Sequence, residues 1–467
     1  MTIEELKPYL TPGRRIHLIG VGGVSMFPLA EVLRGQGVLI TGSDVRESAN
    51  VRHLEEEGVT VFLGHFPENV NGADAVIRTA AVHDDNPEIV SARTQGIPVF
   101  ERAQAWGAIM MDYKHALCIS GTHGKTTVTS MATHIAMAAN IDPTVMIGGN
   151  LPLLGKGYRV GQGDTIILES CEYCNSFLSF RPTIAVILDI EADHLDFFKD
   201  LADVEHSFQI FANLVPEDGV VIANADDRNT MDTLENLDKP MMTFGLGSYA
   251  DVYCDNLAYN RGVGEFDLMQ SGSFVVHINL SVPGLHNVKN ALAAAAAALA
   301  MGISPTAIAA GLRSFHGAER RFEYKGEYHG AKIYDDYAHH PGELHMLLET
   351  AKTLGYDRVI CAFQPHTYSR TKALFPEFVE ELSNADITIL TDIYAAREVN
   401  TLGVSSKDLT AAIPHGEYYP TFDEVEARLK ELARPGDLIL TVGAGELYQV
   451  AERLTAAGKA EQDAAEG

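Results

Sequence analysis

The sequence predicts an α/β protein of three domains: an N-terminal Rossmann-like domain, a central domain of the P-loop ATPase type and a C-terminal Rossmann-like domain. Three observations predict this fold class. Apolar strands alternate with helices along most of the chain, two glycine-rich turns each join a strand to a helix, and 467 residues is the length of about three ordinary domains. We place the domains at residues 1–105, 106–318 and 319–467.

The central domain is predicted from a phosphate-binding loop. A strand over 116–120 leads into Gly121-Thr122-His123-Gly124-Lys125-Thr126-Thr127, and a helix over 128–140 follows. Backbone N–H groups of such a loop, together with the helix N-terminus, bind phosphate oxygens. Lys125 would reach the β- and γ-phosphates of a nucleotide, and the Thr126 hydroxyl would bind Mg²⁺. Ile119 stands where the general pattern has its first glycine, so an ordinary strand-to-helix turn is the alternative.

The N-terminal domain begins with a second glycine turn. A strand over 15–20 leads into Gly20-Val21-Gly22-Gly23, a helix follows, and the next strand leads to Asp44. This is the layout of a dinucleotide-binding unit. Ser25 replaces the third glycine, which weakens the prediction of NAD but not that of a bound phosphate. Asp44 would accept hydrogen bonds from a ribose or a base edge, and an aspartate of a β-turn is the alternative.

Polar loops follow the strands of the central domain. They carry Glu172 and His194, and ligands of open α/β sheets collect at such carboxyl ends. Both residues are candidates for Mg²⁺, although Mg²⁺ prefers oxygen ligands and a single imidazole would be a less usual partner. A surface acid and an ordinary loop histidine are the alternatives. Glu191, Asp193 and Asp196 are expected to be neighbours without a direct role.

The C-terminal domain is expected to be doubly wound, with strands over 331–334, 358–363, 387–390 and 438–442. At the preceding junction Arg321, next to Arg320, could clamp a γ-phosphate, and a surface ion pair is the alternative. His366, Arg370 and Arg397 could meet a substrate carboxylate. The small, polar tail over 456–467 is expected to be frayed.

The net charge and the cysteine spacing indicate which partners and metal sites to expect. A net charge of −28 disfavours nucleic acid and anionic membranes as partners of the whole surface. The N-terminus has no signal-peptide pattern and no apolar run is long enough to span a membrane, so a cytoplasmic chain is expected. Among five cysteines, Cys171 and Cys174 form C-x-x-C, but no suitably spaced partner set completes a zinc site. Cys171 and Cys174 are therefore expected to be either a redox pair or reduced thiols without a role.

Taken together, the motifs resemble the Mur ligase family over about residues 16–445. The resemblance is carried by the two glycine turns, by Glu191-Ala192-Asp193-His194, by Gly284-Leu285-His286-Asn287, by Arg320-Arg321-Phe322, by Asp335-Asp336-Tyr337-Ala338-His339-His340-Pro341 and by Phe363-Gln364-Pro365-His366.

The resemblance implies an ATP- and Mg²⁺-dependent enzyme of peptidoglycan precursor synthesis. Such an enzyme joins L-alanine to the carboxylate of UDP-N-acetylmuramate through an acyl phosphate and releases ADP and phosphate. A family member that attaches a recycled tripeptide shares the nucleotide motifs and is the alternative, and the Phe-Gln-Pro-His segment favours alanine. We expect no nucleic acid partner, no membrane span, and a monomer or homodimer.

The resemblance also implies roles for individual residues. The catalytic set would be Lys125, Glu172, His194 and Arg321, with Thr126, Glu172 and His194 on Mg²⁺. ATP would be held by Gly121, Thr122, His123, Gly124, Lys125, Thr126, Thr127, Asn287, Asn290 and Asp336. The UDP part would be held by Gly20, Gly22, Gly23, Asp44, His65 and Arg102. L-Alanine would lie among Tyr337, His339 and Arg370.

The sequence departs from the commonest family pattern at several positions. Asp189 stands where Asn is frequent, Thr367 replaces an Arg found in many members, and Cys171-Glu172-Tyr173-Cys174 replaces a more acidic run. Two other classes, an NAD-dependent oxidoreductase and a non-catalytic nucleotide-binding regulator, are alternatives. The loop at Lys125 argues against the first. The joint presence of the four predicted catalytic residues argues against the second.

Overall fold

The computed structural model describes residues 2–195, 197–396 and 398–466. They form two compact units: the first combines 1–255, 267–277 and 290–314, and the second combines 256–266, 278–289 and 315–467. Asp196 and Arg397, considered above, lie outside the described residues.

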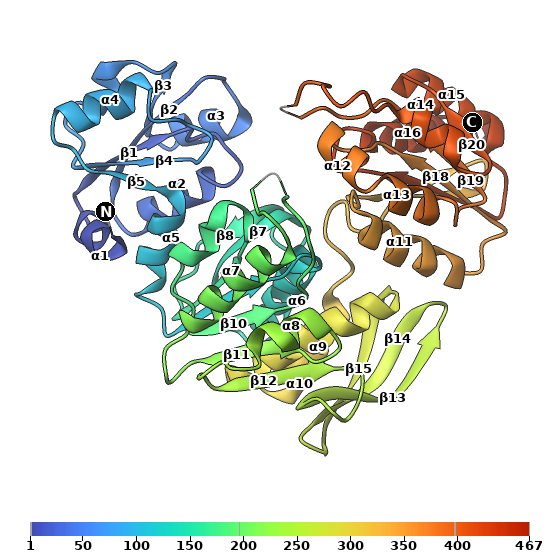
Figure 1. Cartoon of the computed structure of the whole chain (residues 1–467), viewed down its shortest axis with the longest axis horizontal. Coiled ribbons are helices and arrows are strands. Elements are labelled where there is room, and N and C mark those ends of the chain that lie inside the picture. Colours follow the sequence, from blue (N-terminus) through green and yellow to red (C-terminus); the bar gives the residue numbers. More distant parts are fainter. Residues whose placement is uncertain (1, 196, 397, 467) are drawn as a thin grey trace. The chain divides into compact units, whose positions relative to one another are not determined.

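The first unit begins with a five-stranded sheet in the order β3-β2-β1-β4-β5, and every neighbouring pair is parallel (Figure 1). Its strands are β1 (Arg15–Ile19), β2 (Leu39–Asp44), β3 (Thr60–Leu63), β4 (Ala75–Arg78) and β5 (Val99–Glu101), and its helices are α1 (Ile3–Leu6), α2 (Phe27–Gly35), α3 (Ala49–Glu56), α4 (Pro87–Thr94) and α5 (Arg102–Met110). The predicted N-terminal Rossmann-like sheet is confirmed.

A ten-stranded sheet follows in the order β15-β14-β13-β12-β11-β10-β6-β9-β7-β8. Its strands are β6 (His115–Ser120), β7 (Thr144–Leu151), β8 (Lys156–Arg159), β9 (Thr165–Glu169), β10 (Ile184–Ile187), β11 (Val220–Asn224), β12 (Met241–Gly245), β13 (Val252–Asn260), β14 (Val263–Gln270) and β15 (Ser273–Pro283). Its helices are α6 (Lys125–Ala138), α7 (Leu201–Asn213), α8 (Arg228–Leu234), α9 (Leu285–Ala300) and α10 (Pro305–Ser314). The antiparallel β7–β8 pair was not predicted from the sequence.

The core of this sheet explains why its strands read as uninterrupted apolar runs. The side chains of β6 from Ala116 to Ser120 are all buried, and those of β10 are buried along the whole strand. Parallel strands that are covered on both faces bury every side chain rather than alternate ones. Strand β6 lies between β9 and β10 and is therefore central to the sheet.

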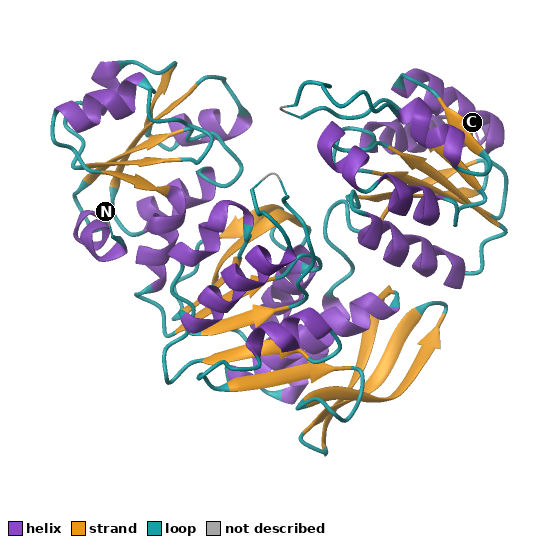
Figure 2. Cartoon of the chain, viewed as in Figure 1, coloured by secondary structure: helices purple, strands orange, loops and turns teal. Residues whose placement is uncertain are grey.

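The second unit holds a six-stranded sheet in the order β16-β17-β21-β18-β19-β20. The strands are β16 (Glu323–Tyr328), β17 (Ala331–Asp336), β18 (Arg358–Phe363), β19 (Ile387–Leu390), β20 (Gly416–Tyr418) and β21 (Asp437–Val442), and only the β16–β17 pair is antiparallel. Figure 2 shows helices against this sheet, and two separate apolar clusters pack on its two faces. These clusters involve α11 (Pro341–Thr353), α13 (Phe375–Leu382), α14 (Ser406–Ala412), α15 (Phe422–Leu432) and α16 (Tyr448–Glu466). A further helix of this unit is α12 (Tyr368–Ala373).

Two further observations bear on the sequence predictions. Residues 456–466 of the tail expected to be frayed instead form the last part of α16, so that prediction is wrong for them. Alanine, which recurs there, has the highest helix propensity, and this outweighs the polar composition. Among the described residues, no helix combines the length and the apolarity that crossing a membrane requires.

Candidate active site

The phosphate loop occupies the carboxyl end of β6 and runs directly into α6. Gly124 precedes the helix with a φ of +81°, a left-handed conformation that favours glycine. A Cβ atom at Gly124 would lie 2.8 Å from Asn290 Oδ1, and one at Gly121 would lie 2.8 Å from Leu188 Cβ. The backbone of the loop therefore packs too closely for side chains at either glycine. The same contact places the Asn290 amide, a predicted ATP ligand, beside the loop.

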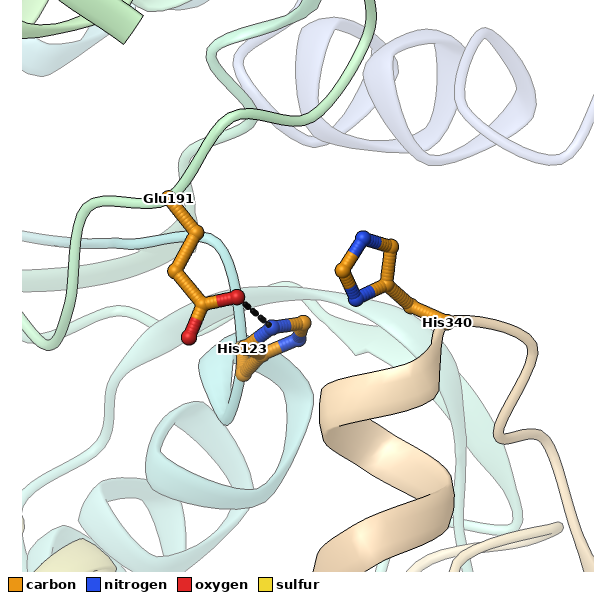
Figure 3. Close-up of side chains that lie close together, drawn as sticks. All are labelled: His123, Glu191 and His340. Carbon is orange, nitrogen blue, oxygen red and sulfur yellow. Dashed lines mark hydrogen bonds and ion pairs between the residues drawn. The ribbon is translucent and has the colours of Figure 1, made fainter. Parts of the chain in front are cut away.

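A second loop, which follows β10, holds the phosphate loop in place. The His123 N–H donates to Asp189 Oδ1 at 2.8 Å, and the Glu191 N–H donates to the Thr122 hydroxyl at 2.9 Å. His123 Nε2 also lies 3.2 Å from Glu191 Oε2 (Figure 3). Burial raises the pKa of Asp189 to about 6, although the neighbouring His123 opposes the shift. These contacts fix the loop before any nucleotide contact is made.

Lys125 is clamped between its own loop and a buried acid. Its Nζ atom donates to the carbonyls of Gly121 and Thr122 and lies 3.1 Å from Glu172 Oε2. Burial alone would lower the pKa of Lys125, but the charges of Glu172, Cys171 and Glu169 and the hydrogen bond to Glu172 together outweigh it, and the pKa is raised. The ammonium group therefore stays protonated at neutral pH, as phosphate binding requires.

Glu172 in turn contacts His194, which comes from the loop after β10. His194 Nε2 lies 3.5 Å from Glu172 Oε1, and the Tyr173 ring lies 4.7 Å from the His194 ring, centroid to centroid. Burial would lower the pKa of His194, but Cys171 and Glu172 raise it to about 10. Burial would raise the pKa of Glu172, yet Lys125 and His194 hold it below its usual range. The structure thus brings together three of the four predicted catalytic residues.

Glu169 is a site residue that the sequence analysis did not single out. The Thr126 hydroxyl donates to Glu169 Oε1 at 3.0 Å, and the Gly148 N–H donates to Glu169 Oε2 at 2.7 Å. Glu169 ends β9, next to β6, so an acid at a strand end was the available signal. It orients the hydroxyl that is predicted to bind Mg²⁺.

In the N-terminal sheet, Asp44 supports the first glycine turn. The Gly22 N–H donates to Asp44 Oδ2 at 2.9 Å, and Gly20 has a φ of +82°. A Cβ atom at Gly22 would lie 2.8 Å from Val51 Cγ2, so the turn leaves no space for a side chain. Gly23 closes the turn by donating its N–H to the Gly20 carbonyl at 3.1 Å. The predicted phosphate turn and Asp44 are therefore one structural element.

His65 contacts a buried acid, Glu88, that was not singled out from the sequence. His65 Nδ1 is 2.9 Å from Glu88 Oε2, and Glu88 is fully buried. Ser43 Oγ donates to the same carboxylate at 2.7 Å and Asn69 Nδ2 donates at 2.6 Å, while His17 Nε2 lies 3.4 Å away. Glu88 thus sets the orientation of the predicted UDP-binding imidazole.

Arg102 begins α5 and lies near Cys171, which follows β9. Burial lowers the pKa of Arg102, and Cys171 and Glu101 oppose that shift. A half-buried guanidinium is suited to an anionic substrate. A cavity of about 820 Å³ elsewhere in this unit, lined by Arg15, Thr41 and Thr60 among others, contains none of the predicted site residues.

In the second unit the two adjacent arginines differ in role. Arg320 Nε donates to the buried Asp335 at 2.9 Å and Nη1 donates to the Gly445 carbonyl at 3.0 Å, so this side chain ties β17 to the loop after β21. Arg321 makes a looser contact, with 3.7 Å between Nη1 and Glu343 Oε1, and its side chain is 29% exposed. Of the two arginines, Arg321 is therefore the more exposed and the less tightly bonded.

The predicted alanine-binding residues form one cluster with His366. The Tyr337 and His339 rings are 5.4 Å apart, and the His339 and His366 rings are 5.7 Å apart, centroid to centroid. Arg370 Nη1 lies 3.2 Å from His366 Nδ1. Burial, together with the charges of His339 and Arg370, lowers the pKa of His366 to about 4, so this imidazole is neutral at pH 7. Glu343, which accepts the His339 N–H at 2.8 Å, is a further residue that the sequence analysis missed.

Two other predicted ATP ligands in this unit already have structural partners. Asp336 accepts the N–H groups of Phe322 and Ala338, both at 2.7 Å, and burial raises its pKa to about 6. Asn287 Nδ2 donates to the Pro283 carbonyl at 2.7 Å.

Beside the alanine cluster, Thr367 has a φ of +65°, a strained conformation for a β-branched residue. Such strain is concentrated at functional sites.

Three family models match consecutive parts of the chain. They are described as "Mur ligase family, catalytic domain" at residues 15–114, "Mur ligase middle domain" at residues 119–298 and "Mur ligase, glutamate ligase domain" at residues 320–445. The chain belongs to the Mur ligase family. The predicted three-domain α/β organisation is confirmed, while the domain boundaries stay predictions.

Relatives of this Mur ligase match nearly its whole length. A protein named UDP-N-acetylmuramate–L-alanine ligase from Caldanaerobacter subterraneus subsp. tengcongensis is 46% identical over 94% of this chain and 97% of its own length. A protein of the same name from Clostridium novyi is 44% identical over 94% of this chain and 96% of its own length.

Solved structures of Mur ligases match as well. The UDP-N-acetylmuramate-alanine ligase of Thermotoga maritima superimposes with a TM-score of 0.78 at 27% identity, covering 96% of this chain and 99% of that one. The murein peptide ligase of Psychrobacter arcticus gives a TM-score of 0.68 at 24% identity, covering 95% of this chain and 98% of that one, and shows a shared fold.

The donor set at the phosphate loop of this Mur ligase fits Mg²⁺, which the family resemblance implied. Mg²⁺ takes oxygen ligands and keeps several waters. Thr126 supplies a hydroxyl at the helix start, and the buried Glu172 supplies a carboxylate whose pKa is below its usual range. Glu169 adds a second carboxylate within hydrogen-bond distance of Thr126. Oxygen donors thus outnumber the single imidazole of His194.

Proposed function

We propose that this chain is an ATP-dependent ligase that joins L-alanine to the carboxylate of UDP-N-acetylmuramate, a step of peptidoglycan precursor synthesis. The observation that carries the choice of substrates is the 46% identity, over 94% of the chain, to a relative named for this reaction. The phosphate loop, with Lys125 and Glu172 in contact, supports the use of ATP.

The reaction explains why ATP is needed. An amine does not displace oxide from a carboxylate, because oxide is a poor leaving group. A carboxylate oxygen therefore attacks the γ-phosphorus of ATP, the bond to the bridging oxygen breaks, and ADP leaves. The alanine amine, after losing a proton, attacks the acyl phosphate, and phosphate departs with the electron pair of the C–O bond. Catalysis rests on positioning and on neutralising phosphoryl charge.

In the first unit, Lys125 would exchange its loop carbonyls for β- and γ-phosphate oxygens, and the N–H groups of Gly121, Thr122, His123, Gly124, Thr126 and Thr127 would surround the phosphates. Mg²⁺, held by Thr126, Glu172 and His194, would neutralise phosphate charge when bound. The Gly20-to-Gly23 turn would receive the diphosphate of the UDP part. Asp44, His65 and Arg102 would complete that subsite.

In the second unit, Arg370 would bind the alanine carboxylate, and Tyr337 and His339 would enclose the amino acid. His366, whose Nδ1 accepts from Arg370 Nη1, would hold that guanidinium in position. Arg321 would meet the γ-phosphate. Asp336 would bind the ATP ribose and Asn287 would lie near adenine, and in the first unit Asn290 has the same predicted role. We further expect a cytoplasmic monomer or homodimer.

Phosphate release tests this function directly. The chain is incubated with ATP, Mg²⁺ and UDP-N-acetylmuramate, and separately with L-alanine, glycine, L-serine or the L-Ala-D-Glu-diaminopimelate tripeptide. Turnover highest with L-alanine supports the proposal. Turnover with the tripeptide alone would assign the recycling reaction instead, and no turnover with any acceptor would refute a ligase of this type.

A further inference from the structure

The fold completes a cluster of metal-binding side chains that sequence spacing did not predict. The Cys171 thiol, a Glu172 carboxylate oxygen and a His194 ring nitrogen all lie within 4.8 Å of one another. Cys171 and Glu172 follow β9, whereas His194 follows β10. The two strands flank β6, so both loops reach the same edge of the sheet. A partner for Cys171 therefore comes from the neighbouring loop and not from a second cysteine pair.

We propose that Cys171, Glu172 and His194 bind a thiophilic divalent cation such as Zn²⁺, and that this cation inhibits the ligase. The inhibitory half rests on the function proposed above, whereas the binding half does not.

The donor set supports a thiophilic ion. Zn²⁺ and Cd²⁺ accept one sulfur, one imidazole nitrogen and one carboxylate oxygen, and Zn²⁺ sites with three protein ligands keep a fourth position for water or another oxygen. Mg²⁺ does not take thiolate ligands. Cys171 is exposed and offers a route of entry, while Glu172 is almost fully buried. The cluster thus combines an accessible soft ligand, the Cys171 sulfur, with a buried hard ligand, the Glu172 carboxylate.

The position of Glu172 explains why binding would inhibit. Its Oε2 lies 3.1 Å from Lys125 Nζ, and its Oε1 lies 3.5 Å from His194 Nε2. A cation on the His194 side would draw the carboxylate away from Lys125 and occupy two residues that the ligase needs for Mg²⁺. Thiophilic metal and Mg²⁺ would therefore compete for the same carboxylate.

Cadmium absorption measures binding without turnover. The reduced, chelator-treated full chain is titrated with Cd²⁺, and thiolate-to-cadmium charge transfer is followed in the ultraviolet. We expect one equivalent to bind, the band to disappear in Cys171→Ser and Cys171→Ala, and the band to persist in Cys174→Ser. Cys174 is the matched control, because it is also exposed, lies three residues further on and is not one of the three clustered residues.

Affinity should fall by about 100-fold or more in the Cys171 variants, because outer-shell partners alone are worth roughly 10–100-fold. Equal bands in wild type and Cys171→Ser, or no band in wild type, would overturn the site. Loss of the band in Cys174→Ser alone would move it to the other thiol and refute this assignment.

The inhibitory half is measured as phosphate release in the presence of Zn²⁺, with each variant compared to its own metal-free rate. We expect inhibition that a chelator or excess Mg²⁺ reverses, and a much weaker response in Cys171→Ser. Zn²⁺ that binds without slowing turnover would refute inhibition. A chain that binds Cd²⁺ but shows no ligase activity would refute the proposed function and leave the site intact.

Discussion

Replacing Glu88 with glutamine tests how the N-terminal nucleotide subsite is held together. The fully buried carboxylate receives Ser43 Oγ, Asn69 Nδ2 and His65 Nδ1 at 2.7, 2.6 and 2.9 Å. A glutamine side chain keeps one acceptor oxygen and turns an NH₂ group toward the remaining donors. At least one buried donor then loses its partner at a cost of about 1–3 kcal/mol, and the other bonds lose their ionic character. We expect a total destabilisation of about 2–4 kcal/mol.

Urea unfolding followed by Trp106 fluorescence measures this loss. Trp106, the only tryptophan, is fully buried in α5 and belongs to the same apolar cluster as Ile16 and Leu18. With a urea dependence of about 2 kcal/mol per molar, the midpoint should fall by about 1–2 M. Glu56→Gln, at the exposed end of α3, is the matched control and should change stability by less than about 0.5 kcal/mol.

The pH dependence of this difference gives a second readout. Burial would raise the pKa of Glu88, but hydrogen bonds from His17, Asn69 and Ser43 lower it overall. A lowered folded-state pKa means that the carboxylate stabilises the fold fully above the ordinary pKa of glutamate, and that this contribution is lost as the pH falls through the folded value. The gap between wild type and Glu88→Gln should therefore shrink in acid. A gap below about 0.5 kcal/mol at pH 7, or one that does not change with pH, would refute the network.

Four further changes test the two units. Lys125→Ala should abolish phosphate release with the fold intact, a loss beyond the roughly 10²–10³-fold that one neutral oxyanion donor is worth. His339→Ala should raise the KM for L-alanine about tenfold, the cost of one good hydrogen bond, with little effect on the KM for ATP. Arg320→Ala should cost about 3–5 kcal/mol in unfolding free energy because it removes the ion-pair partner of the buried Asp335. Arg321→Ala should change stability by less than about 1 kcal/mol and lower kcat by about 10³-fold, since its ion pair is partly exposed.

Circular dichroism and steady-state kinetics check these variants together. Near-normal ATP-dependent turnover in Lys125→Ala would rule out the assigned phosphate loop. Equal changes in both KM values for His339→Ala would remove that residue from the amino-acid subsite. If Arg320→Ala and Arg321→Ala behaved alike, the division into a structural and a ligand-binding arginine would be wrong.

The sequence predicts a helix or strand correctly where its pattern of apolar and polar residues matches which of its side chains are buried in the fold. Strands such as β6, β18 and β19 are short apolar runs between polar loops, and the glycine turns at Gly20 and Gly121 mark where they end. The β7–β8 pair escaped prediction because its glycine-rich residues carry no clear alternation, although β7 pairs with β9 in the sheet. Tertiary pairing, rather than local preference, makes this segment a strand.

Spacing along the chain predicted the site only where a motif is continuous, whereas Glu172 and His194 were expected from their places after strands. Lys125 and Thr126 belong to one loop, so their type and spacing indicated their chemistry. Glu88 was not recognisable, because an acid in the first turn of a helix is ordinarily explained by the helix dipole. The partners of Cys171 were missed for a different reason: His194 is distant along the chain and becomes a neighbour only through the sheet order.

The contacts between the phosphate loop and the loop after β10 have a consequence for protein engineering. Asp189 and Glu191 each bond to the phosphate loop, at His123 and Thr122. The two loops therefore have to be exchanged together between relatives, although more than 60 residues separate them in the chain. A chimera that imported residues 121–127 from a relative without 188–194 would receive only one of the two loops. Transplanting both segments together is the design that would preserve the nucleotide subsite.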